Sequence, residues 1–106
     1  MCTKRLADTE DLLIVALCAD YERRKRALSR GVLPHVTEME YKYLNYKIYD
    51  AAAETVGENL AEIYISEIGN RTGYAASAID SISETTYKLK KNKIKAAIAK
   101  KLHLSF

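Results

Sequence analysis

The sequence has very few of the residues that interrupt regular structure: one proline and four glycines in 106 residues. Sandwiches and barrels of β-strands need a turn about every ten residues, and glycine and proline supply many of those turns. Their scarcity therefore argues against an all-β fold. The chain is instead rich in residues that favour helix. We expect an all-α fold of four to five helices, with residues 1–106 forming a single helical domain.

Cysteine and histidine are also scarce. The two cysteines, Cys2 and Cys18, and the two histidines, His35 and His103, have no spacing typical of a zinc or redox site. We therefore expect free thiols, no metal and no cofactor. The longest wholly apolar run, residues 12–19, has eight residues and is too short to cross a bilayer. Because no signal-peptide pattern precedes it, the sequence predicts a cytoplasmic protein without membrane contact.

Sequence patterns of catalysis are absent as well. There is no glycine-rich phosphate loop, no ligand-spaced cluster of histidine, cysteine and acids, and no serine at a nucleophile elbow. The acids of the helical segments are scattered, and we expect solvated helix faces for Asp20, Glu22, Asp50, Glu54, Glu62 and Glu67. The sequence therefore predicts no catalytic residue and no enzymatic activity.

Apolar residues at helical spacing divide the chain into segments. The first helix is expected over residues 9–29. Its inner face is expected to carry Leu13, Leu17, Tyr21 and Leu28. Central helices are expected over residues 37–68, with a break at Gly57. Thr37 and Glu40 have the spacing of a capping box at the start of the central helices.

The segment 37–56 is apolar around most of its circumference. One face carries Leu44, Ile48, Ala51, Ala52 and Thr55. A second face carries Met39, Tyr43, Tyr46 and Ala53. A helix that is apolar over so wide an arc belongs in a core, whereas a tyrosine-rich flank also suits a dimer surface. We favour the core for the second face and retain a homodimer contact as the alternative.

The last quarter of the chain has the pattern of an amphipathic helix with a defined start. Ser83 can cap the free N–H groups of the first turn, and Glu84 suits the positive end of the helix dipole. A buried stripe is predicted at Tyr87, Ile94, Ile98 and Leu102. The opposite side carries Thr85, Lys88, Leu89, Asn92, Lys93 and Ala96.

Positive charge is concentrated in the same stretch. Residues 82–106 hold seven lysines against the single acid Glu84, whereas the whole chain has a net charge of only +3. The remainder is therefore slightly acidic. A basic end on an acidic body suits a polyanionic partner. A lysine-rich amphipathic helix is also common as a plain solvated surface helix, and that alternative stays open.

Residues 74–104 are expected to form a helix-turn-helix whose second, basic helix is the recognition helix. Residues 74–79 form either a short helix or a loop. If they form a helix, it is the first helix of the motif and a turn follows it. If they form a loop, the preceding helix is the first helix of the motif and the turn is unusually long. The residues predicted to contact DNA are Ser83, Thr85, Lys88, Leu89, Asn92 and Lys93. They offer hydroxyl, amide, ammonium and apolar groups to base edges and phosphates.

Two stretches resemble the end of a known family. Residues 82–91, Ile-Ser-Glu-Thr-Thr-Tyr-Lys-Leu-Lys-Lys, and residues 98–102, Ile-Ala-Lys-Lys-Leu, are similar to the C-terminus of the ArpU/RinA-type phage transcription regulators. Those proteins are similar in layout to region 4 of sigma factors, and residues 20–25 resemble their N-terminal helix. The resemblance covers about the last quarter of the chain in detail. It implies a prophage-encoded regulator that binds double-stranded DNA, with RNA polymerase as a further partner.

The sequence thus predicts a phage-type DNA-binding transcriptional regulator that is not an enzyme. One alternative is a small helical protein-interaction module, such as a phage inhibitor of a host complex, whose basic helix meets an acidic protein surface. Another is a small subunit of a DNA-packaging machine, which would bind DNA and form rings. A regulator binds duplex DNA with a steep salt dependence from counterion release, whereas an inhibitor leaves free duplex alone.

Overall fold

The computed structural model describes residues 8–104. Within this range the chain contains helices and loops and no strand, which confirms the all-α fold. The helices are α1 (Asp8–Ala19), α2 (Tyr21–Arg30), α3 (His35–Val56), α4 (Glu58–Gly69) and α5 (Glu84–Lys101). One 3₁₀ turn, η1 (Tyr74–Ala76), lies between α4 and α5.

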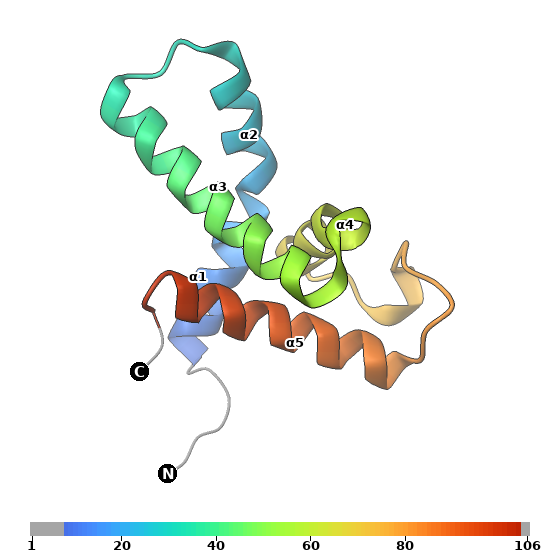
Figure 1. Ribbon diagram of the computed structural model, residues 1–106. Coiled ribbons are helices and arrows are strands. Elements are labelled where there is room, and N and C mark those ends of the chain that lie inside the picture. Colours follow the sequence, from blue (N-terminus) through green and yellow to red (C-terminus); the bar gives the residue numbers. More distant parts are fainter. Residues whose placement is uncertain (1–7, 105–106) are drawn as a thin grey trace.

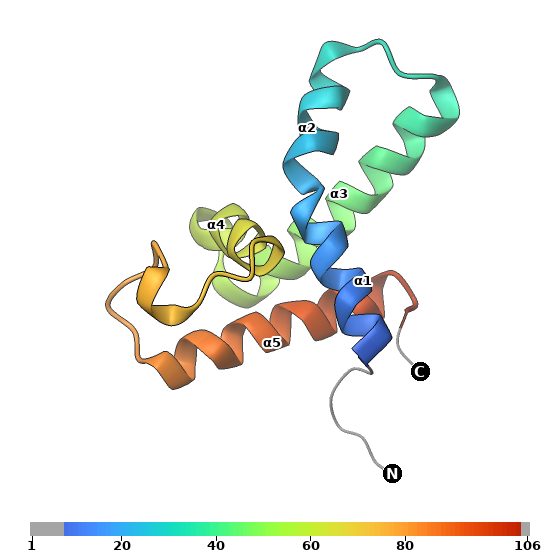
Figure 2. The same cartoon turned by 180° about the vertical axis from the view of Figure 1, so that it is seen from behind.

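The helices form a body and an arm. The arm consists of α2 and the first half of α3, which lie side by side and rise away from the other helices in both views (Figures 1 and 2). The body consists of α1, α4, α5 and the second half of α3. The helix α5 runs along one edge of the body and packs against α3 and α1 (Figure 1). One long side of α5 is therefore left open.

The core lies in the body, where α1, α3, α4 and α5 meet. Its largest fully enclosed side chains are Tyr64, Tyr87, Ile14, Ile48, Ile65, Ile68, Ile94 and Ile98. On α1 the buried residues are Ile14, Val15 and Cys18, whereas Leu13 is 43% exposed, so its predicted place on the inner face was wrong. Every residue from 12 to 19 is apolar, and periodicity alone therefore could not select the face that packs against α4.

The single helix expected over residues 9–29 is two helices, which are interrupted at Asp20. The interruption is short, because the Asp20 N–H still donates to the Ala16 carbonyl and the Asp20 carbonyl accepts from the Arg24 N–H. The Asp20 carboxylate pairs with the guanidinium groups of Arg23 and Arg24. This carboxylate places negative charge at the start of α2, where the helix dipole favours it.

A buried polar contact joins the two helices of the arm to the body. Arg24 is 2% exposed; its Nε donates to Asn45 Oδ1 (2.7 Å), and a terminal nitrogen donates to the Leu17 carbonyl (2.7 Å). Asn45 Nδ2 donates in turn to the Tyr21 carbonyl (3.2 Å). Because a buried charge without partners is costly, these bonds fix α2 against α3 in one register.

The start of α3 differs from the prediction. It begins at His35, two residues before the expected start, with Pro34 as its N-cap, and no side chain caps this end. The capping box expected from Thr37 and Glu40 therefore does not form. The fixed φ of proline suits the first turn of a helix, which explains the earlier start. The break at Gly57 is confirmed, and its φ of +89° is one that other residues rarely adopt.

One side of α3 within the arm is exposed. Ile48, Ala51 and Ala52 are buried as predicted. On the second face the assignment to the core was wrong for Met39, Tyr43 and Tyr46, whereas Ala53 packs against the core as predicted. We give the name outer stripe of α3 to these three exposed residues together with Val36: Val36 (69% exposed), Met39 (55%), Tyr43 (48%) and Tyr46 (63%). None of the other described helices covers these side chains.

The helix α4 ends in close contact with α1. A Cβ atom at Gly69 would lie 2.5 Å from the Ala19 nitrogen, so the two backbones touch. The chain then turns through Arg71, which has a φ of +55°. The Arg71 N–H donates to the Ile68 carbonyl and the Thr72 N–H to the Glu67 carbonyl, as in a Schellman motif.

A long connector, residues 70–83, joins α4 to α5. Residues 74–76 form the 3₁₀ turn, and residues 77–83 contain no helix, so the loop alternative is the one found. The helix before α5 is therefore α4. A compact helix-turn-helix, which joins its helices by about three or four residues, is not confirmed.

Candidate nucleic-acid interface

The helix α5 begins where the sequence predicts. The Thr86 N–H donates to Ser83 Oγ (3.1 Å), which is an N-cap bond, and the Ser83 hydroxyl donates to Thr86 Oγ1 (3.0 Å). Glu84 follows in the first turn. Ser83 thus has a structural role, and a DNA contact by its hydroxyl would compete with the cap.

The buried side of α5 is also as predicted. Tyr87 is 1% exposed, Ile94 and Ile98 are fully buried, and Leu102 packs against the core from its edge. The Tyr87 ring lies against Tyr64, with ring centroids 5.9 Å apart. Burial, together with a hydrogen bond to an acid, raises the pKa of Tyr87 to about 12. This neutral aromatic side chain anchors the N-terminal half of α5.

The opposite side of α5 is exposed along its length. The exposed residues of this side are Thr85, Lys88, Leu89, Asn92, Lys93 and Ala96. Five of the six predicted DNA contacts therefore share one open face, and the sixth, Ser83, stands at its end. Leu89 is 51% exposed. An 18-residue helix is about 27 Å long, so this face can meet an extended partner.

Four of the seven lysines in α5 are held by groups of the protein itself. The contacts are Lys88 to Glu84 (2.9 Å), Lys91 to the Thr72 carbonyl (2.7 Å), Lys95 to Asp11 (2.8 Å), and Lys101 to Asp50 (2.9 Å) and Glu54 (3.2 Å). Within residues 8–104, Lys90, Lys93 and Lys100 have no ion pair. The charge available to a partner is therefore smaller than the sequence suggests.

Lys88 differs from the other three held lysines. Both members of its pair with Glu84 are more than half exposed, and such surface pairs contribute little. A phosphate can therefore replace Glu84 at little cost. Lys93 and Lys100 are one heptad apart and lie on the same flank of the exposed face.

Glu67 holds the connector against α4 and α5. It is 6% exposed, and its Oε1 accepts from the Tyr87 hydroxyl (2.6 Å) and the Ser77 hydroxyl (2.6 Å). Its Oε2 accepts from the Ala78 N–H (2.7 Å). Burial by itself would raise the pKa of Glu67, but these hydrogen bonds and the charge of Lys91 outweigh burial and lower it. The expected solvated position of Glu67 was wrong.

The sequence contained one signal for this role. Glu67 is the only charged residue in the run Ile-Tyr-Ile-Ser-Glu-Ile, residues 63–68. Lys91 reinforces the same junction, because its Nζ lies 4.9 Å from the centre of the Tyr87 ring and donates to the Thr72 carbonyl. Burial and the nearby Lys95 lower the pKa of Lys91. Glu67 and Lys91 therefore set the position of α5 and are not free to bind a partner.

Among residues 8–104 no group of three or more histidine, cysteine and acidic side chains is placed to hold a metal ion. Cys18 is a buried free thiol, and burial raises its pKa to about 12. Cys2 lies outside the described residues.

The exposed face of α5 carries amide, hydroxyl, ammonium and apolar groups in one row. In the part of the chain that the structure covers, no helix is both long and apolar enough to cross a membrane.

Comparisons with protein families, with curated proteins and with solved structures give no match to this chain.

Proposed function

We propose that the protein binds double-stranded DNA through the exposed face of α5 and acts as a phage-type transcription regulator that is not an enzyme. The observation that carries the proposal is the row of Thr85, Asn92 and Lys93 on one open helix face. Lys100, which has no ion pair among the described residues, lies beside this row. An α-helix fits the major groove, where amides and hydroxyls read base edges and ammonium groups hold phosphates.

Each side chain of the row has a distinct role. Asn92 can make a bidentate contact to adenine, and Leu89 can contact a thymine methyl group. Lys93 and Lys100 carry no ion pair within residues 8–104 and contact phosphates along one flank. Lys88 joins them by exchanging Glu84 for a phosphate. Thr85 lies near the start of α5 and donates to a phosphate or a base edge.

The regulatory part of the proposal is supported by the resemblance of residues 82–91 and 98–102 to phage regulators. This part of the proposal includes RNA polymerase as a second partner. It also includes action in the cytoplasm, because the DNA lies there. A compact helix-turn-helix is not required, because α3 and α1 support α5 and the connector replaces a tight turn. In this arrangement α4 is the helix that precedes the recognition helix.

Titration of a specific and a scrambled duplex at two salt concentrations tests the DNA proposal. Asn92→Ala should lower the preference for the specific duplex by roughly 1–3 kcal/mol and leave binding of the scrambled duplex almost unchanged. Lys93→Ala should weaken both complexes alike and reduce the salt slope by about one. Lys42→Ala is the matched control, because it removes the same charge from the arm. Unchanged binding in both α5 variants, or an equal loss in the Lys42 variant, would contradict the proposal.

We also propose that the protein forms a homodimer through the outer stripe of α3. Its four residues are spaced by three and four, as at the a and d positions of a coiled coil. A tyrosine side chain covers about 200 Å². Two such half-exposed rings plus a valine and a methionine make an apolar patch of a few hundred Å², the size of the largest patches on soluble proteins, which are often functional. Paired copies of a DNA reader match two-fold operators.

Sedimentation measures this association directly. Tyr43→Glu places a charge in the outer stripe and should give a monomer at concentrations where the unaltered chain is a dimer. Leu12→Glu alters an exposed apolar residue on α1 and should leave the dimer intact. A monomeric unaltered chain would rule out the dimer.

A second candidate function is a protein-interaction module. The outer stripe of α3 favours it, since an exposed helical stripe also suits the groove of another protein. A monomer that leaves free duplex unbound and binds a host protein through this stripe would support the module over the regulator. Rings in the sedimentation experiment would instead favour a packaging subunit.

A further inference from the structure

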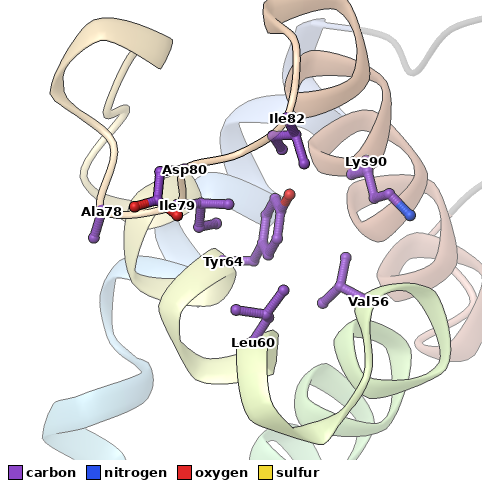
Figure 3. Close-up of a pocket in the computed structure, with 8 residues that line it drawn as sticks. All are labelled: Val56, Leu60, Tyr64, Ala78, Ile79, Asp80, Ile82 and Lys90. Carbon is purple, nitrogen blue, oxygen red and sulfur yellow. The ribbon is translucent and has the colours of Figure 1, made fainter.

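A small cavity lies where the connector passes the corner between α3 and α4 (Figure 3). It is lined by Val56, Leu60, Tyr64, Ala78, Ile79, Asp80, Ile82 and Lys90. Its volume is about 290 Å³, against about 150 Å³ for an apolar cavity that binds benzene. Most of the wall is apolar, and the size is at the lower end of small-molecule sites.

The hydroxyl of one largely buried side chain opens into this cavity, and no described residue pairs with it. Tyr64 is 1% exposed, and its hydroxyl has no hydrogen bond to any residue between 8 and 104. No fully enclosed side-chain nitrogen or oxygen in that range lacks a partner, so the Tyr64 oxygen keeps some accessible surface, and Tyr64 lines the cavity. Figure 3 shows the ring standing in the middle of the cavity with its oxygen pointing towards Ile82. Burial and the charge of the nearby Glu67 raise the pKa of Tyr64, so its hydroxyl stays protonated and can donate a hydrogen bond.

The two charged lining residues stand at opposite edges. Lys90 lies on the side of Val56, and Asp80 lies on the side of Ile79 (Figure 3). Lys90 has no ion pair within the described range. Its ammonium points outward, but the flexible side chain can bring the ammonium over the opening of the cavity. The Asp80 carboxylate disfavours negative charge at its own edge. A negative charge on a ligand is therefore favoured only at the Lys90 edge.

The wall on the connector side is fixed before any ligand arrives. Glu67 holds Ser77 and Ala78 by hydrogen bonds, and the Tyr74 hydroxyl donates to the Ile82 carbonyl (2.7 Å). A cavity that is already formed costs little ordering when a ligand binds. A hydroxyl that no described residue pairs with and walls that are already fixed are the properties of a binding site.

We propose that this cavity binds a small apolar monocarboxylate, such as an arylalkanoate of about ten non-hydrogen atoms. Its apolar body lies among Leu60, Ile79 and Ile82. A carboxylate oxygen accepts the bond from the Tyr64 hydroxyl, and Lys90 balances the charge. The proposal goes beyond DNA binding and does not depend on it.

Methyl NMR of the full chain tests the site with three probes of one shape: 3-phenylpropionate, 3-phenylpropan-1-ol and 3-phenylpropylamine. The acid should give saturable shifts of the Ile79 and Ile82 methyl groups and none at Ile14, which lies in the core beside α4. The alcohol and the amine should bind several times more weakly. The Ile14 methyl signal also reports that each variant remains folded.

Two variants separate the polar contacts. Tyr64→Phe removes one hydroxyl without changing the ring and should weaken the acid roughly three- to tenfold. Lys90→Gln should weaken it roughly two- to fivefold, whereas Lys42→Gln, with the same charge change on the arm, should have no effect. Three results would each overturn the proposal: no saturable shift with the acid, equal binding of the amine, or an unchanged affinity in Tyr64→Phe.

Discussion

Replacement of Glu67 tests how the connector holds α5 in place. Its carboxylate accepts bonds from Tyr87, Ser77 and the Ala78 N–H. Hydrogen bonds to a charged group contribute about 1.5–3 kcal/mol, against about 0.5–1.5 kcal/mol for neutral ones. Glu67→Gln keeps the size and one acceptor, and the two hydroxyls can rotate to accept from the new amide. We expect it to lower the free energy of unfolding by roughly 1–3 kcal/mol.

Glu67→Ala should cost more. It leaves the Ala78 N–H without a partner and opens a void beside Tyr87, so we expect a loss of roughly 3–5 kcal/mol. A domain of this size has a total stability of about 5–15 kcal/mol. The alanine variant should therefore be close to the limit of folding, and the glutamine variant gives the cleaner measurement.

The effect of the glutamine variant should depend on pH. The folded chain holds the pKa of Glu67 below its ordinary value of 4.5, so the folded state binds this proton more weakly than the unfolded state does. Its contribution to stability is thus complete above pH 4.5 and is lost as the pH falls through the lowered pKa. The difference between Glu67→Gln and the unaltered chain should be largest near pH 7 and should shrink below pH 4.5.

Urea denaturation followed by circular dichroism at pH 7 and pH 3.5 measures both effects. Glu58→Gln is the matched control, because Glu58 is an exposed acid at the start of the same helix. The free energy of unfolding of Glu58→Gln should fall by between a few tenths of a kcal/mol and about 1 kcal/mol. If Glu67→Gln were no more costly than Glu58→Gln, or if its cost did not change with pH, the carboxylate would not be the group that holds the connector.

Three further predictions address the core. Ile94→Ala should destabilise the fold by roughly 2–5 kcal/mol, because Ile94 is fully buried, and a change under about 0.5 kcal/mol in urea denaturation would place this face of α5 in solvent. Gly69→Ala should lower the free energy of unfolding by roughly 1–3 kcal/mol, because its Cβ would meet the Ala19 backbone. This loss is expected although alanine is the better helix former. An equal or higher melting temperature would contradict that contact. In a Cys2→Ser background the Cys18 thiol, whose pKa burial raises to about 12, should react with a thiol reagent at pH 8 only as the protein unfolds, and rapid reaction would show that it is accessible.

The orientation of α5 could be predicted because its signals are dense and local. Ser83 caps a helix that starts at the next residue, and Tyr87, Ile94 and Ile98 mark one face without contradiction. The all-α class followed from the lack of glycine and proline. Helix boundaries and faces that depend only on nearby residues are visible in a sequence of this kind.

Features that depend on distant residues could not be predicted. The orientation of α1 depends on its contact with α4, because Leu13 and Ile14 are equally apolar and only packing distinguishes them. Glu67 receives its donors from residues 10, 11 and 20 positions away, a distance at which spacing carries no signal. Tyr43 and Tyr46 looked like core residues because nothing in their own segment indicates that this part of α3 projects into solvent.

The projecting arm gives the molecule an uneven stability. Between residues 25 and 44 no residue is buried, and the last enclosed contact towards the tip is the one between Arg24 and Asn45. Segments with few buried contacts open by local fluctuation far more often than the whole chain unfolds. The arm beyond Arg24 should therefore separate and reclose many times while the body stays folded. Any partner that covers the outer stripe of α3 would suppress these openings, so the arm would gain order on binding.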